Sequence, residues 1–159
     1  MTDARLRLDD QLCFALYAAT NAITRAYRPL LRELGITYPQ YLTLMVLWQH
    51  RTGTVSELAQ HLDLPAHAMT PLLQRLEQAG LIVRRRSPID SRAVLIELTS
   101  VGVELETSAA AVQRTVKCAT GLSPETLAAL RGELHELVDD MRATAAGPHL
   151  QGSGKVVFQ

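Results

Sequence analysis

The sequence is poor in aromatic residues and in cysteine. Aromatic side chains make up 4% of its 159 residues, and there are two cysteines. Two widely spaced cysteines are too few for the disulfide framework of a small secreted protein, and they lack the closely spaced Cys or His neighbours of a metal site. We therefore expect reduced thiols, no bound metal and no cofactor.

Long apolar segments are also missing. No stretch approaches the roughly 18 apolar residues that a membrane-spanning helix needs. Residues 1–10 alternate in charge where a signal peptide would have an apolar centre. The sequence therefore predicts a cytoplasmic protein that makes no contact with a membrane.

Positive charge is concentrated in one segment, although the formal net charge of the chain is zero. Residues 75–92 contain five arginines and two acidic residues, whereas residues 93–142 contain four basic and eight acidic residues. A compact basic block in an otherwise neutral chain favours a local contact with a polyanion. The alternative is a solvated surface cluster.

The first half of the chain reads as helical. Apolar residues recur every three or four positions over residues 9–34, which predicts a helix that Pro29 kinks and Gly35 ends. A second, strongly apolar helix is predicted over residues 39–50. The segment "RTGT", residues 51–54, is predicted to be a turn.

Two short helices follow. Thr54 and Glu57 have the spacing of a capping box, which marks the start of the first one. The second is ended by Gly80, and Pro71 falls early in it. Either this helix begins only near Thr70 or it tolerates Pro71 in its first turns. Two short helices joined by a brief turn are typical of a helix-turn-helix.

The pattern then changes to strands. Residues 81–86 and 93–98 are β-rich runs on either side of the turn-forming segment "SPIDS", which predicts a hairpin. Two more helices are predicted over residues 100–121 and 124–146, the second capped by Ser123.

This order of elements predicts a mainly α protein with a small β-hairpin wing (α+β class). It corresponds to a winged helix-turn-helix with long N- and C-terminal dimerisation helices. We expect four regions: an N-terminal dimerisation and sensor helix (1–36), a DNA-binding region (37–98), C-terminal dimerisation helices (99–146), and a disordered tail that resembles a cloning remnant (147–159).

The second helix of the pair should enter the major groove of DNA, where its early residues meet base edges. These residues are Ala66, His67, Met69, Thr70, Pro71 and Gln74. For His67, a capping or solvent-exposed role is the alternative. We expect phosphate contacts from Arg75, Arg84, Arg85 and Arg86. At the tip of the wing, Arg92 can enter the minor groove.

The helix-to-wing segment resembles the MarR family of bacterial regulators. The matching text is "MTPLLQRLEQAGLIVRRR" followed by "DSRAVLIELTSVG", in which Asp90 and Arg92 match the Asp-x-Arg wing signature of the family. The resemblance covers about residues 9–145. It implies a homodimer that binds a pseudo-palindromic, double-stranded DNA operator. It also implies that Asp90 braces the wing by pairing with an arginine.

The first helix resembles one branch of that family, the organic hydroperoxide regulators (OhrR). The likeness lies in "QLCFALYAATNAITRAYRPLLRELGITYPQYL", which includes Cys13, Tyr17 and Tyr27. In that branch the cysteine senses an organic hydroperoxide, and tyrosines matching Tyr17 and Tyr27 hydrogen-bond its thiolate. The resemblance implies a repressor whose Cys13 thiolate attacks the peroxide and becomes a sulfenic acid.

The spacing along this helix points to two chains. Cys13 and Tyr27 are 14 residues apart, which is about 21 Å along a helix, so they cannot touch within one chain. Their angular positions nearly coincide, with Tyr17 between them. Two such helices packed antiparallel about a two-fold axis would place Cys13 of one chain against the tyrosines of the other.

Cys118 resembles the resolving cysteine of the two-cysteine members of this branch. The resemblance implies that its thiol condenses with the oxidised Cys13 to form an intersubunit disulfide. The two Cα atoms must then approach to about 4.4–6.8 Å. If they start farther apart, the helices must move and the wings must reorient.

Two other functions remain open on the sequence alone. The chain could be a MarR-type regulator that small phenolic ligands release from DNA, with Cys13 a small core residue. It could instead be an enzyme, a two-cysteine thiol peroxidase, but the wing argues against this. We therefore predict a DNA-binding regulator that is not an enzyme.

Overall fold

A computed structural model of the chain describes residues 6–90 and 92–146. The chain divides after Ala119 into two units, which are described separately. The first unit contains a 3-10 turn η1 (Leu8–Asp10), α1 (Leu12–Glu33), α2 (Tyr38–His50), β1 (Thr52–Thr54), α3 (Val55–His61), α4 (Ala66–Gln78), β2 (Ile82–Arg86), β3 (Val94–Leu98) and α5 (Ser100–Ala119). The second unit contains α6 (Pro124–Ala146). The expected tail at residues 147–159 lies outside the described residues.

The first unit has one hydrophobic core, which draws on α1 to α4 and on the sheet. Its largest fully buried side chains are Leu31, Thr43, Leu44, Leu47, Leu58, Met69, Leu73, Leu76, Ile82 and Ile96. α5 adds its buried face to the same core through Ala109, Val112 and Val116. The apolar faces of the helix-turn-helix (α3 and α4) are therefore buried in this core, and their polar faces are exposed to solvent.

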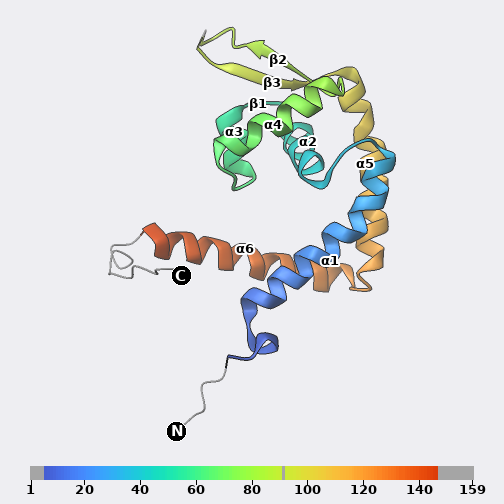
Figure 1. Ribbon diagram of the computed structural model, residues 1–159, viewed down its shortest axis with the longest axis vertical. Coiled ribbons are helices and arrows are strands. Elements are labelled where there is room, and N and C mark those ends of the chain that lie inside the picture. Colours follow the sequence, from blue (N-terminus) through green and yellow to red (C-terminus); the bar gives the residue numbers. More distant parts are fainter. Residues whose placement is uncertain (1–5, 91, 147–159) are drawn as a thin grey trace, which may run out of the picture. The chain divides into compact units, whose positions relative to one another are not determined.

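The sheet has three antiparallel strands in the order β1-β3-β2. Ile96 of β3 lies opposite Gly53 on one side and Arg84 on the other. Figure 1 shows the β2–β3 hairpin projecting beyond α3 and α4 as a wing. The prediction of a turn at residues 51–54 was wrong, because this segment pairs with a strand more than 40 residues later in the chain.

The first helix begins later than predicted. Residues 8–10 form a separate 3-10 turn, and Gln11 is extended (φ −96°, ψ 122°), so α1 starts at Leu12. The helix continues through Pro29 to Glu33. Gly35 has a φ of +72° at its end, as expected for a left-handed terminating residue.

The helix-turn-helix is specified by local capping. The Thr54 side chain accepts a hydrogen bond from the Glu57 amide, and the Glu57 carboxylate accepts one from the Thr54 amide at 2.7 Å. α4 begins at Ala66 and keeps Pro71 inside it. Of the two predicted alternatives, the structure therefore has the helix that tolerates Pro71.

The base of the wing is fastened to α5 at close range. A Cβ atom on Gly102 would lie 2.1 Å from the carbonyl oxygen of Leu81. The Thr99 hydroxyl donates to the Gly80 carbonyl at 2.6 Å, and the indole N–H of Trp48 donates to the Gly102 carbonyl at 2.8 Å. These contacts join α2, α5 and the start of β2.

The described part of the second unit is dominated by one long helix, α6. Ser123 caps it by accepting a hydrogen bond from the Thr126 amide at 3.2 Å, as predicted. Leu130, Val138 and Met141 are exposed on α6. Large exposed apolar side chains on a helix are typical of a surface that packs against a partner.

No helix within residues 6–90 and 92–146 is both long enough and apolar enough to cross a bilayer.

The Gly102 contact gives a test of the fold. Gly102→Ala should lower the free energy of unfolding by roughly 1–3 kcal/mol, because the new methyl group meets a backbone carbonyl that cannot move aside. Ser100→Ala, at an exposed position in the same turn, should change it by less than about 0.5 kcal/mol. Urea unfolding followed by circular dichroism measures both. Equal effects would show that α5 does not depend on this contact.

Candidate DNA-binding surface and thiol site

α4 separates a buried apolar face from an exposed polar one. The predicted DNA-contacting residues on the exposed face are His67, Thr70, Pro71, Gln74 and Arg75. Met69, which we also expected to meet a base edge, is fully buried with Leu73 and Leu76. That prediction was wrong, because Met69 lies on the same side of the helix as the two core leucines.

The arginines of the wing strand are partly paired within the chain. Nε of Arg84 lies 3.1 Å from the Glu77 carboxylate, and Nε of Arg85 lies 3.0 Å from that of Glu97. Arg86 is exposed two residues beyond Arg84, on the same face of the strand. Exposed ion pairs of this kind contribute little to stability, so a phosphate can compete for these guanidinium groups.

The turn of the wing is held by Asp90. Its carboxylate accepts a hydrogen bond from the backbone amide of Arg92 at 2.9 Å. Its own amide donates to the Ser87 hydroxyl at 3.2 Å, and the Ser87 amide donates to the Ala93 carbonyl at 2.9 Å. Asp90 thus contacts the main chain of Arg92, and the Arg92 side chain is exposed.

Cys13 is exposed in the first turns of α1. Tyr17, one helical turn later, is 66% exposed. The N-terminal half of α1 therefore presents a thiol and a phenol to solvent.

Tyr27 has a different environment, because the C-terminal half of α1 packs into the core. Its side chain is 9% exposed, and its ring centroid lies 5.2 Å from that of Tyr38 and 5.4 Å from that of Tyr41. The structure therefore does not bring Tyr17 and Tyr27 together on one exposed stripe. It brings Tyr27 together with the two tyrosines of α2, which we call the tyrosine cluster (Tyr27, Tyr38, Tyr41). The close spacing of Tyr38 and Tyr41 in "TYPQY" was the available signal.

Burial changes the acidity of the tyrosine cluster. Desolvation raises the pKa of all three phenols above its usual value. The neighbouring phenol of Tyr27 raises the pKa of Tyr38 and Tyr41 further. The three hydroxyl groups therefore stay neutral, as hydrogen-bond donors, over the whole physiological pH range.

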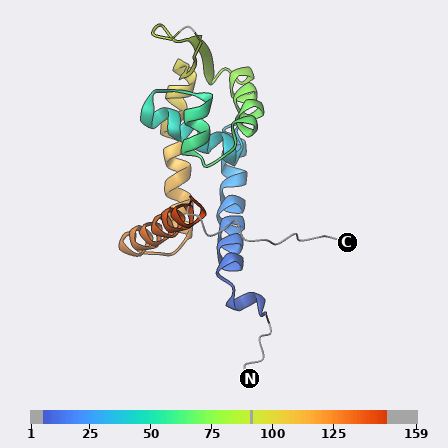
Figure 2. The same cartoon turned by 90° about the vertical axis from the view of Figure 1, so that its left-hand side faces the viewer.

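Cys118 is exposed in the last turn of α5. α1 and α5 lie side by side and run in opposite directions, so the first turn of α1 and the last turn of α5 lie at the same end of the unit (Figure 2). Both thiols are free. Within the described parts of the chain, no group of three His, Cys, Asp or Glu side chains could hold a metal ion.

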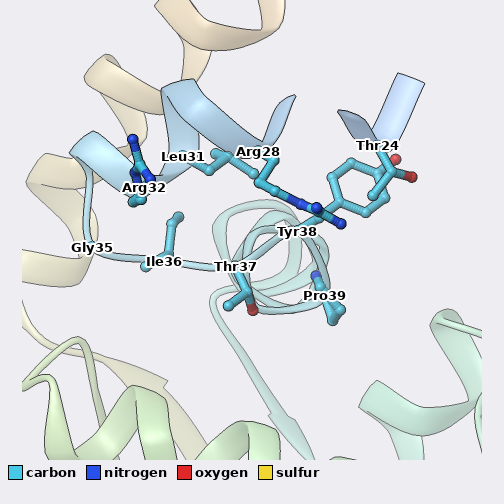
Figure 3. A pocket seen from close by; sticks show the side chains of 9 residues that line it. All are labelled: Thr24, Arg28, Leu31, Arg32, Gly35, Ile36, Thr37, Tyr38 and Pro39. Atoms are coloured by element: carbon cyan, nitrogen blue, oxygen red, sulfur yellow. The ribbon is translucent and has the colours of Figure 1, made fainter. Parts of the chain in front are cut away.

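A cavity of about 540 Å³ lies beside the tyrosine cluster, where α1 turns into α2. Leu31 and Ile36 are buried and form its apolar floor, and Tyr38 lines one side. Arg28 and Arg32 are exposed at its rim, and Figure 3 shows Arg28 reaching toward the ring of Tyr38.

The tyrosine cluster predicts a pH dependence of stability. As the pH rises above about 10, phenols of the unfolded chain lose protons that the buried phenols retain, so unfolding is favoured. The free energy of unfolding should therefore fall as the pH rises from about 10 towards the raised pKa values of the buried phenols, and Tyr41→Phe should reduce that slope. Urea unfolding across this range measures it. Tyr17→Phe, at an exposed position, is the matched control, and an equal change of slope in both variants would contradict the assignment.

Comparison with known proteins identifies the family. A model of the MarR family matches residues 36–94. The chain is 43% identical over 136 residues to the organic hydroperoxide resistance transcriptional regulator of Bacillus subtilis, covering 86% of this chain and 92% of that protein. It is 42% identical over 143 residues to the transcriptional regulator TtmR of Methylorubrum extorquens, covering 90% of this chain and 73% of that protein.

Solved structures agree with this assignment. Reduced AbfR bound to DNA is 33% identical, with a TM-score of 0.70 over 89% of this chain and 99% of that chain. A disulfide form of AbfR is 30% identical, with a TM-score of 0.61 over 89% of this chain and 94% of that chain. AbfR is a protein of Staphylococcus epidermidis. The predicted winged helix-turn-helix is confirmed, and the relatives are regulators rather than enzymes. The chain belongs to the MarR family of transcriptional regulators.

Proposed function

We propose that the protein is a dimeric repressor that binds operator DNA when Cys13 is reduced and releases it when an organic hydroperoxide oxidises Cys13. The observation that carries this proposal is an exposed cysteine at the start of α1 in a chain that is 43% identical to an organic hydroperoxide resistance regulator. An exposed thiol is open to a dissolved oxidant, as a redox sensor requires.

The proposed DNA contacts follow from the exposed surface of α4 and of the wing. Base edges meet His67, Thr70, Pro71 and Gln74 in the major groove, and phosphates meet Arg75, Arg84, Arg85 and Arg86. The Arg92 side chain reaches the minor groove, while Asp90 keeps the wing turn in shape. The likeness to AbfR, solved in its reduced form on DNA, supports this docking.

The chemistry begins at the Cys13 thiolate. The thiolate attacks the outer oxygen of the hydroperoxide and the O–O bond breaks, which gives a cysteine sulfenic acid and an alkoxide. The alkoxide takes a proton from solvent and leaves as an alcohol. Hydroxyl donors stabilise a thiolate. We propose that the partner's Tyr17 and Tyr27 supply them, together with the partner's Tyr38, whose ring packs against that of Tyr27.

The second step uses Cys118. Its thiolate attacks the sulfenic sulfur, the S–O bond breaks as the disulfide forms, and the hydroxide takes a proton from solvent and leaves as water. Cys13 and Cys118 are on α1 and α5, which lie side by side, and we propose that the bond forms between subunits. The likeness to AbfR, for which a disulfide form is known, supports this step.

Cys13→Ser tests the sensor. The variant should still bind operator DNA, because Cys13 is on a different helix from α4 and serine keeps a small polar side chain at that position. Cumene hydroperoxide should release the wild type and leave the variant bound, as measured by fluorescence anisotropy of labelled operator. Release of the variant by peroxide would rule out sensing at Cys13. Release of the unoxidised wild type by a phenolic ligand would favour the ligand-responsive alternative.

Cys118→Ser tests the disulfide. Oxidised wild-type protein should run at the mass of a dimer on a non-reducing gel and return to a monomer with dithiothreitol. The variant should lose that band while its Cys13 still becomes a sulfenic acid, detected by dimedone labelling. A monomer band alone from oxidised wild type would contradict an intersubunit bond.

A further inference from the structure

The cavity beside the tyrosine cluster is open and has a mixed character. Its floor is apolar, from Leu31 and Ile36, and its rim carries the guanidinium groups of Arg28 and Arg32. A fitting occupant is an apolar group that carries negative charge beside it.

The chain carries such a segment at its own N-terminus. Leu8 is 61% exposed and Leu12 is 60% exposed, so neither leucine is covered within the chain. Asp9 and Asp10, between them, are exposed as well. Among the described residues, a carboxylate oxygen of Asp10 lies 3.8 Å from Nε of Arg7 in the same turn, and both side chains are exposed. This acidic, apolar segment is the chemical complement of the cavity.

Within one chain the two cannot meet, because Leu12 and Arg28 are separated by about 24 Å of helix. A second copy brings them together. The proposed function places Cys13 opposite the partner's Tyr27 in an antiparallel pair of α1 helices. That pairing puts the two-fold axis near Thr20, so Leu12 lies opposite the partner's Arg28.

The charges of this segment and of the cavity rim are opposite. Leu12 is the first residue of α1, so the helical register applies to it and places it opposite the partner's Arg28. Residues 8–10 precede the helix and are not in that register, but they adjoin Leu12 and carry the two carboxylates of Asp9 and Asp10. Opposite charges are therefore available beside Leu12 when it reaches the partner's cavity.

We propose that Leu8 and Leu12 of one subunit fill the cavity of the other, with Asp9 and Asp10 paired to Arg28 and Arg32 at its rim. This inference rests on the proposed function, since it uses the Cys13–Tyr27 pairing. The contact occurs twice in the dimer.

The consequence concerns the thiol. Cys13 directly follows Leu12, so docking of the leucines holds the thiol beside the Tyr38 side of the partner's cavity. The segment is thus a positioning element for the sensor. In the reduced dimer, the partner's leucines therefore fill the cavity, and it is not a binding site for a small apolar anion.

Cross-linking tests this register independently of DNA and peroxide. In a Cys13→Ser, Cys118→Ser background, we would add Leu12→Cys and Arg28→Cys together and treat the protein with a short bismaleimide. Each single addition is the matched control, because two equivalent sites lie about 24 Å apart across the axis. The double addition should give a covalent dimer on a denaturing gel, and the single additions should not.

A second pair of variants tests the charges without cysteine. Asp9→Lys with Asp10→Lys should weaken dimerisation about tenfold in sedimentation, and adding Arg28→Glu with Arg32→Glu should restore it.

The outcomes separate the two proposals. Sedimentation could show a dimer that neither cross-links nor responds to the charge swaps. That result would overturn the docking of the segment and would leave redox-controlled DNA binding unaffected. A monomeric background protein would remove the dimer on which the proposed function itself depends. Displacement of the segment by a fatty acid at micromolar concentration, seen as loss of the cross-link, would show that a small apolar anion is the occupant.

Discussion

The position of the wing depends on how closely α5 approaches the start of β2. Gly102 leaves no room for a side chain against the Leu81 carbonyl, and its own carbonyl is held by the Trp48 indole at 2.8 Å. Trp48 also meets Tyr41 edge-on, with ring centroids 6.3 Å apart, and Tyr41 packs against Tyr27. The C-terminal half of α1, α2, α5 and the wing are therefore one continuous set of contacts. Because packed side chains of this kind shift together rather than singly, these contacts offer a physical path from α1 to the wing.

Elements with a strong local signal could be predicted from the sequence, and elements that depend on distant pairing could not. The capping box of Thr54 and Glu57 and the left-handed Gly35 each involve backbone groups only a few residues away. The local sequence is therefore enough to predict them. The strand at residues 52–54 is three residues long and exists because β3 lies beside it. The burial of Met69 likewise follows from the start of α4 at Ala66, which Pro71 made ambiguous in the sequence. The prediction of the winged fold was nevertheless correct. It depends on the order of the helices and the hairpin, and neither the strand at residues 52–54 nor the burial of Met69 changes that order.

At the candidate thiol site, too, the local geometry could be predicted from the sequence and the packing of distant elements could not. Helical geometry gives the angle between Cys13 and Tyr27 but does not say which part of α1 the rest of the chain covers. α2 and α5 cover the C-terminal half, so Tyr27 joins Tyr38 and Tyr41 in the interior while Tyr17 remains exposed. The inference that the thiol and Tyr27 meet only between two chains depends on their separation along the helix, and the burial of Tyr27 leaves that separation unchanged. Burial adds that the phenol is neutral and fixed in place, which suits a donor.

A sensor built from two chains links chemistry to assembly. In a single chain Cys13 lies in solvent, so the groups that the proposal assigns to its thiolate reach it only from a partner. If the partner's hydroxyl groups stabilise the thiolate, the thiolate must stabilise the dimer by the same free energy, since the coupling is reciprocal. In the proposed mechanism, oxidation would remove the negative charge from the sulfur and with it this contribution to the interface. The proposed disulfide would replace that contribution with a covalent bond of different geometry. The dimer would then be retained with its wings spaced differently, and operator release would need no dissociation of the subunits.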